Sequence, residues 1–170
     1  MRAPRTRSPI AVAAAAAIAL SVLPAAAKPL TYACDPGHTE VRFTYVHAGF
    51  SSQNGEFEKF DCVLVLDADD PGSATLKVTV ATDSVSTGVP DLDADLRSEN
   101  FFDAKKFPTM TFVSTTVRAR GANSATVVGE LTVKDVTKPI ALDVKLVNIG
   151  KHPMGEFIEF FKGEWVGVRA

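Results

Sequence analysis

The sequence predicts an all-β fold, an antiparallel β-barrel interrupted by one short helical insertion. Runs of alternating apolar and polar residues recur from residue 38 to residue 168, and short loops rich in Gly, Ser, Asn or Asp separate them. One stretch, residues 87–112, breaks this pattern with an Asp-rich helical turn, a Phe-Phe pair and a Phe-Pro corner. A two-layer β-sandwich is the competing architecture, because it has the same pattern of strands and turns.

The first 27 residues are predicted to be a signal peptide and to take no part in the fold. Three arginines between residues 2 and 7 come before an apolar run at 10–23, and small residues provide a cleavage site near Ala27. A membrane anchor is the alternative, but the apolar run is shorter than the roughly 20 residues needed to span a bilayer. We therefore expect a periplasmic or secreted protein without stable membrane insertion, in which residues 28–170 form a single domain.

Charge and cysteine content narrow the choice of partner and compartment. The chain has 18 basic and 20 acidic residues, and the predicted cleavage removes three arginines and no acid. A mildly acidic surface argues against nucleic acid as a partner. After export, Cys34 and Cys62 would meet an oxidising compartment, where a disulfide bond between them is one expectation. Two small buried apolar side chains are the other, because the sequence does not give their separation in space.

The first strand is expected within residues 38–47. Val41, Phe43 and Tyr45 alternate there with charged or hydroxyl-bearing residues, as in a strand with one buried face. The segment 49–55 is rich in Gly, Ser and Asn, so we expect a loop that returns the chain antiparallel.

The remaining strands follow the same logic. Within residues 56–67 the apolar phase shifts between Phe57 and Phe60, which indicates a β-bulge, and the turn at 69–72 ends that hairpin. Further strands are expected near residues 74–82, 109–119, 124–134, 139–149 and 156–168.

One helix is expected, at residues 91–97. Three aspartates lie in its first turns and Arg97 near its end, where each suits the helix dipole. Leu92 and Leu96 give it a short apolar edge. We interpret the aspartates as solvated capping charges, with a calcium site as the alternative.

Motifs spread along most of the chain carry a resemblance to a known family. They are Tyr32-x-x-Asp35-x-x-His38, Val41-x-Phe43, His47-x-Gly49, Gly55-x-Phe57, Thr87-Gly88, Leu96-Arg97-Ser98, Phe101-Phe102-Asp103, Phe107-Pro108-x-Met110-x-Phe112, Gly129-x-Leu131-Thr132 and Val136-Thr137-x-Pro139. In this order they resemble the YceI-like family, also called the polyisoprenoid-binding or lipocalin-like barrel family. The resemblance covers nearly all of residues 31–155.

Three features depart from the family pattern. Asp95 stands where the family often has His, and Asp135 replaces a turn Gly. The sequence also stops at Ala170, where the family would continue into a final strand. We therefore expect a C-terminally incomplete barrel with two unpaired edges, and pairing of those edges in a homodimer is one way to close it.

The resemblance implies an exported carrier that holds a polyisoprenoid, either a quinone-like or a prenyl-phosphate lipid, in an apolar cavity without transforming it. It implies no cofactor. The physics is compatible, because an isoprenoid tail is recognised by the apolar area it removes from water, worth roughly 25 cal/mol per Å². The chain has 11 Phe against two Tyr and one Trp, which supply apolar walls. Taken alone, the pattern also fits a filled barrel in which these Phe side chains form the core.

The expected ligand-binding residues fall into three groups. Apolar strand residues form the cavity wall, two Phe residues after the helix form a lid or plug, and one His and one Arg contact a polar head group. For the Arg, an ion pair with a neighbouring Asp is the competing role. In chain order they are Val41, Phe43, Tyr45, His47, Phe57, Phe60, Leu64, Val78, Arg97, Phe101, Phe102, Phe112 and Leu131.

Neither a metal site nor a catalytic residue is predicted. His38 and His47 are nine residues apart, so they face opposite ways on an unbroken strand, and His152 lies in a distant loop. We expect a hydrogen-bonded structural role for His38. The sequence has no nucleophile elbow and no Cys-His pairing. The alternatives that remain are a small-molecule hydrolase or isomerase that uses the same cavity, and a structural stress protein with a filled barrel.

Overall fold

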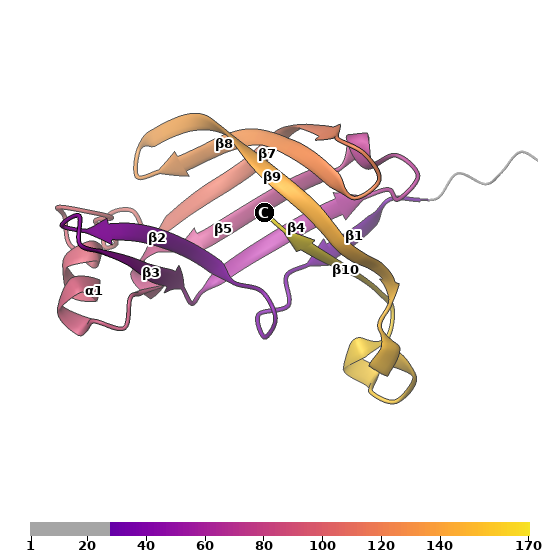
Figure 1. Ribbon diagram of the computed structural model, residues 1–170, viewed down its shortest axis with the longest axis horizontal. Coiled ribbons are helices and arrows are strands. Elements are labelled where there is room, and N and C mark those ends of the chain that lie inside the picture. Colours follow the sequence, from indigo (N-terminus) through magenta and orange to yellow (C-terminus); the bar gives the residue numbers. More distant parts are fainter. Residues whose placement is uncertain (1–27) are drawn as a thin grey trace, which may run out of the picture.

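The computed structural model describes residues 28–170, so the predicted signal peptide lies outside the described residues. Ten strands and one α-helix make up the described chain. One sheet has seven strands in the order β1-β4-β5-β7-β8-β9-β10, and a smaller sheet has the order β2-β3-β6. The expected all-β antiparallel barrel with one helical insertion is confirmed, although the barrel is not fully closed (Figure 1).

The seven-stranded sheet curls so that its first and last strands approach each other (Figure 1). Its strands are β1 (Leu30–Ala33), β4 (Phe60–Leu66), β5 (Thr75–Ala81), β7 (Thr109–Ala119), β8 (Ser124–Val133), β9 (Val136–Lys151) and β10 (Glu164–Arg169). Neighbouring strands are antiparallel throughout. Burial, and then the carboxylate of Glu164, raises the pKa of Tyr32, so the facing edges of β10 and β1 lie within electrostatic reach.

The smaller sheet and the helix cover one end of the barrel (Figure 1). They are β2 (Val41–His47), β3 (Ser51–Phe57), β6 (Val85–Ser86) and α1 (Pro90–Arg97). Short 3-10 turns occur at Pro71–Ser73, Thr82–Ser84, Pro153–Glu156 and Glu159–Phe161. The helix begins one residue before the expected start, with proline in the first turn, where its missing N–H costs nothing.

The expected bulged strand at residues 56–67 is instead a change of sheet. β3 ends at Phe57 in the small sheet and β4 begins at Phe60 in the large one. Ser84 holds this corner, because its carbonyl accepts from the Glu58 N–H at 3.1 Å and its Oγ accepts from the Lys59 N–H at 3.0 Å. The phase shift in the sequence therefore marks a real break in the strand. At this break the chain passes from the small sheet to the large one.

Two other expected boundaries were wrong. Most of the expected loop at 49–55 is strand β3, which pairs with β2 from Ser51 to Phe57. The expected strand at 156–168 is mostly a small lobe of 3-10 turns, and β10 begins only at Glu164. The lobe, residues 153–163, projects away from the barrel (Figure 1).

Within residues 28–170, a cluster of buried hydrophobic residues lies at the end of the barrel that carries α1. Phe57, Val80 and Val85 are buried there, and the half-buried side chains of Val41, Phe43, Phe60, Val78, Leu96, Phe102 and Met110 pack against them. Glycine makes room for two of the aromatic rings. A Cβ at Gly55 would lie 2.3 Å from the Phe43 ring, and one at Gly129 would lie 2.5 Å from the Phe112 ring.

The structure joins Cys34 to Cys62 by a disulfide bond, with Cα atoms 5.2 Å apart. Cys34 directly follows β1, and Cys62 lies within β4, the strand that pairs with β1. The bond therefore ties an edge strand of the barrel to its neighbour and closes a loop with a sequence separation of 28 residues.

Candidate functional site

The inner face of the large sheet is apolar along most of its width. Val78 packs against the buried cluster, so it lies on the face of the large sheet that is turned toward β2 and β3. Residues paired across neighbouring strands share a face, so the register identifies the other residues on this inner face. Val78 pairs with Phe112, and Phe112 pairs with Leu131. The inward row continues along β4, β5, β8 and β9 through Leu64, Leu76, Val127, Ile140, Leu142 and Val144.

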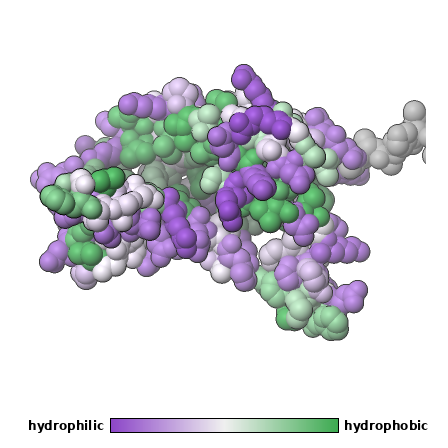
Figure 2. All heavy atoms as spheres, viewed as in Figure 1, coloured by the Kyte–Doolittle hydropathy of each residue, from purple (hydrophilic) through white to green (hydrophobic). Residues whose placement is uncertain are grey.

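Many of these inward side chains are only half-buried. Leu64, Leu142 and Val144 keep intermediate exposure, although they lie on the concave side of the sheet. By contrast, Phe112 and Val127 are 6% exposed. Figure 2 shows the molecule hollowed beneath β7 and β8, with apolar surface around the recess. Away from α1, part of the apolar inner face is therefore left uncovered by the protein's own side chains, and we call this recess the apolar hollow.

Aromatic side chains close the hollow at the α1 end. The ring centroids of Phe43 and Phe57 lie 5.6 Å apart, and those of Phe57 and Phe102 lie 5.5 Å apart in an edge-to-face arrangement. Tyr45 continues this row toward the β2–β3 turn, 6.2 Å from Phe43. Of the expected lid pair, Phe102 thus joins the packed end, whereas Phe101 is 48% exposed.

The expected site residues separate into three places. Those packed together at the α1 end are Val41, Phe43, Phe57, Phe60, Val78 and Phe102. Leu64, Phe112 and Leu131 lie on the inner face farther along the sheet, while His47 is exposed at the end of β2. The expected wall is therefore partly a packed plug and partly the lining of the hollow.

Arg97 is used within the protein. Its Nε donates to the Asp83 carbonyl at 2.7 Å and its Nη2 donates to the Val85 carbonyl at 2.5 Å. The expected ion pair with a neighbouring Asp is replaced by these two carbonyl bonds, which tie α1 to β6. We therefore assign Arg97 a structural role in place of the head-group contact expected from the sequence.

The interpretation of the aspartates as solvated charges was wrong for one of them. Asp93 is 9% exposed, and its Oδ1 accepts from the Thr87 N–H at 2.7 Å and from the Thr87 hydroxyl at 2.6 Å. It thereby fixes the loop before the helix. Asp91 is exposed in the first turn, where the helix dipole favours its charge.

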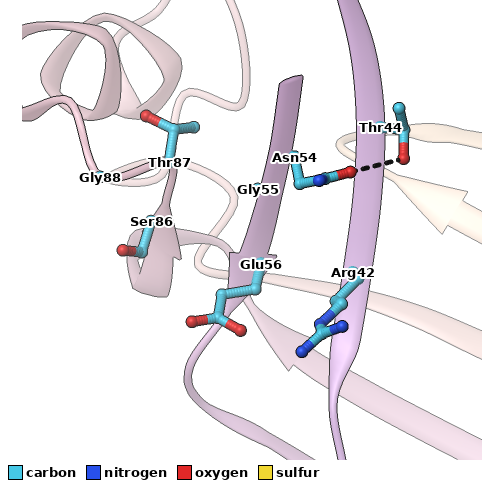
Figure 3. Close-up of a pocket in the computed structure, with 8 residues that line it drawn as sticks. All are labelled: Arg42, Thr44, Asn54, Gly55, Glu56, Ser86, Thr87 and Gly88. Atoms are coloured by element: carbon cyan, nitrogen blue, oxygen red, sulfur yellow. Dashed lines mark hydrogen bonds between the residues drawn. The ribbon is translucent and has the colours of Figure 1, made fainter. Parts of the chain in front are cut away.

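A polar pocket of about 570 Å³ lies on the other face of β2 and β3, a feature that the sequence did not reveal (Figure 3). Thr44 Oγ1 donates to Asn54 Oδ1 at 3.0 Å within it. The pocket carries charges of both signs, and its Arg42 already pairs with Glu40 at 2.7 Å. Its lining is Arg42, Thr44, Asn54, Gly55, Glu56, Ser86, Thr87 and Gly88. These groups suit water better than a hydrocarbon tail.

His38 and His152 have separate roles. His38 Nδ1 lies 2.6 Å from Asp35 Oδ2, so the expected hydrogen-bonded role is confirmed. Hydrogen bonds from His38 and from the Gly37 N–H lower the pKa of Asp35. His152 stacks on Phe161 at 4.2 Å between ring centroids, and its Nδ1 accepts from the Met154 N–H. Within residues 28–170, no three His, Cys, Asp or Glu side chains are grouped to hold a metal ion.

Over residues 28–170, no helix is long and apolar enough to cross a bilayer.

Comparison with known proteins agrees with this architecture. A family model described as the YceI-like domain matches residues 32–165. A UPF0312 protein of Pseudomonas aeruginosa PAO1 is 39% identical over 126 residues, which cover 74% of this chain and 65% of that protein. Protein YceI of Salmonella paratyphi B is 38% identical over 118 residues, covering 69% of this chain and 61% of its own. The chain thus spans about two thirds or less of the length of these relatives.

Solved structures show the same fold. A Campylobacter jejuni YCEI protein matches with a TM-score of 0.58 and 31% identity, covering 73% of this chain and 72% of that one. Burkholderia cenocepacia BcnA matches with a TM-score of 0.65 and 24% identity, covering 69% of this chain and 73% of its own. At 24% identity, the likeness to BcnA is evidence of the fold alone.

Proposed function

The chain belongs to the YceI-like family, known as polyisoprenoid-binding barrel proteins, and from that premise we propose that it is an exported carrier of an isoprenoid lipid. The lipid tail lies in the apolar hollow of the barrel, and the protein holds it without transforming it. Export follows the N-terminal signal expected from the sequence.

The half-exposed inner face carries this proposal. A packed barrel would bury Leu64, Leu142 and Val144, whereas here they keep intermediate exposure on a concave apolar surface. A tail that covers a few hundred Å² of such surface gains on the order of 10 kcal/mol before the cost of ordering it is subtracted. That gain is sufficient for binding without a specific polar contact.

The tail contacts follow from the positions of the expected wall residues. We assign Leu64, Phe112 and Leu131 to the wall that the tail contacts, and the aromatic cluster of Phe43, Phe57 and Phe102 to the closed end of the hollow. His47 and Tyr45 lie beyond that cluster, toward the β2–β3 turn, so a polar head group would reach them only where the cluster opens. Pairing of the β1 and β10 edges between two copies remains a proposal that the oligomeric state would test.

The test is lipid extraction from protein purified without detergent, followed by mass spectrometry. We expect an isoprenoid lipid in the wild-type extract and its loss from Leu64→Gln, which places an amide in the apolar hollow. Val63→Gln is the matched control, because the neighbouring Val63 is 44% exposed and lies on the opposite face of the same strand.

Thermal unfolding of both variants separates binding from folding. The proposal fails if the wild-type extract contains no isoprenoid, or if folded Leu64→Gln retains as much lipid as Val63→Gln.

A further inference from the structure

The tight turn between β2 and β3, residues 46–51, exposes two apolar side chains. Phe50 is 94% exposed and Val46 is 68% exposed. The turn is ordered by a hydrogen bond of 3.0 Å from the Phe50 N–H to the His47 carbonyl. Ala48 and Gly49 adopt left-handed backbone conformations, with φ of 49° and 79°. Phe50 is therefore held outward by a defined turn.

The turn segment itself carries no fixed charge. Residues 46–55 contain no Asp, Glu, Lys or Arg, although 22% of the chain is charged. The other strongly exposed apolar segment, the lobe at 153–163, differs in this respect. There Phe157 is 79% exposed, but Glu156 and Glu159 lie beside it in the chain. Removing those carboxylates from water would oppose insertion into lipid, whereas the β2–β3 turn has no carboxylate among its own residues.

The turn lies close to the closed end of the hollow. Tyr45 directly precedes Val46 and lies 6.2 Å from Phe43, which packs on Phe57 at the closed end. The inner face of β2 thus runs from the exposed turn to the aromatic cluster, past His47 and Tyr45, which pair with Ser51 and Gln53 of β3.

The size of the exposed surface favours a bilayer over a second protein chain. Two side chains fall far short of the roughly 1,000 Å² that a stable protein interface needs. A bilayer accepts single apolar side chains at its head-group boundary, and the small area gives weak, reversible attachment. Since the turn carries no cationic side chain, we expect no requirement for anionic lipid.

We propose that the β2–β3 turn is a membrane-contact element, with Phe50 as its anchor, that docks the open barrel on a zwitterionic lipid surface for exchange of its ligand. This inference rests on the proposed carrier function. The docking itself requires only the turn, so the two can be tested separately.

The first experiment is flotation of residues 28–170 with phosphatidylcholine vesicles. We expect Phe50→Ser to lower the vesicle partition coefficient by about tenfold, given the transfer free energy of one aromatic side chain. Phe157→Ser, on the charged lobe, is the matched control and should partition like the wild type. The inference is overturned if the two variants partition alike, or if only vesicles with phosphatidylglycerol bind the protein.

Fluorescence gives an independent readout. The wild type has a single Trp, at position 165, remote from the turn in sequence. Phe50→Trp should therefore gain a vesicle-dependent blue shift that the wild type lacks, and the absence of this shift would overturn the inference.

Lipid extraction distinguishes failure of the docking from failure of the function. Phe50→Ser should retain its isoprenoid, yet take it up more slowly from loaded vesicles. A wild type that carries isoprenoid without binding vesicles refutes the docking alone. One that binds vesicles through Phe50 without carrying isoprenoid refutes the carrier function and leaves the docking in place.

Discussion

The two ends of the barrel interior share one sequence pattern but differ in how they are filled. At the α1 end, Phe57 is 5% exposed and Val85 is fully buried, because β2, β3, β6 and α1 cover the sheet there. Along β9, Leu142 and Val144 alternate just as regularly, yet they remain only half-buried. Alternation thus determines which face turns inward, whereas the elements packed against that face determine whether it becomes a core or a cavity.

The largest expected effect tests the packed end. Phe57→Ala should lower the free energy of unfolding by about 3–5 kcal/mol, since it removes a buried ring that contacts Phe43 and Phe102. Urea unfolding measures this loss. A loss below about 1 kcal/mol would mean that this end is as loosely packed as the rest of the interior.

The disulfide tests the edge of the barrel away from that packing. Cys34→Ser with Cys62→Ser should cost about 3 kcal/mol, because the bond closes a loop with a separation of 28 residues. Thermal unfolding with and without a reducing agent provides the measurement. Reduced wild type should match the double variant, and insensitivity of the wild type to reduction would contradict the assignment.

Substitution of Gly129, on the inner face of β8, tests how closely this face is packed beside the hollow. Gly129→Ala should cost about 1–3 kcal/mol, because its Cβ would lie 2.5 Å from both the Phe112 ring and the Val113 carbonyl oxygen. Gly167→Ala is the control, since its nearest contact would be 3.7 Å, to Val147. Equal denaturation midpoints for the two variants would show that both the Phe112 ring and the β7 backbone at Val113 move aside at little cost.

The sequence predicted the faces of the strands better than their partners. Val41, Phe43 and Tyr45 were expected on one face, and the register places them there. The break between Phe57 and Phe60 was visible, but its meaning depends on Ser84, a residue far along the chain that holds the corner between two sheets. A local phase shift cannot distinguish a bulge from a change of sheet, because both reverse the alternation.

The site was predictable only in part, for a related reason. Apolar periodicity marked Phe57 and Leu64 alike as wall residues, although one packs in the plug and the other faces the hollow. The role of Arg97 depends on the backbone carbonyls of Asp83 and Val85. Every residue has such a carbonyl, so the sequence does not show which ones lie near Arg97. Likewise, the exposure of Phe50 follows from the geometry of the β2–β3 turn. The composition of residues 49–55 predicted only a loop.

The smallest expected effect on stability is the most informative about function. Leu142→Ala should cost only about 1 kcal/mol in the lipid-free protein, because a half-exposed Leu loses less transfer free energy and leaves no closed cavity. Bound lipid stabilises the native state by an amount that grows with the logarithm of its affinity, so a substitution that weakens lipid binding should cost clearly more when isoprenoid is present. Calorimetry of the delipidated and reloaded protein measures both values. Phe57→Ala should show no such dependence on lipid, because its ring already has protein partners. If Leu142→Ala costs the delipidated protein as much as Phe57→Ala does, the two ends are packed alike and the hollow is not available to a ligand.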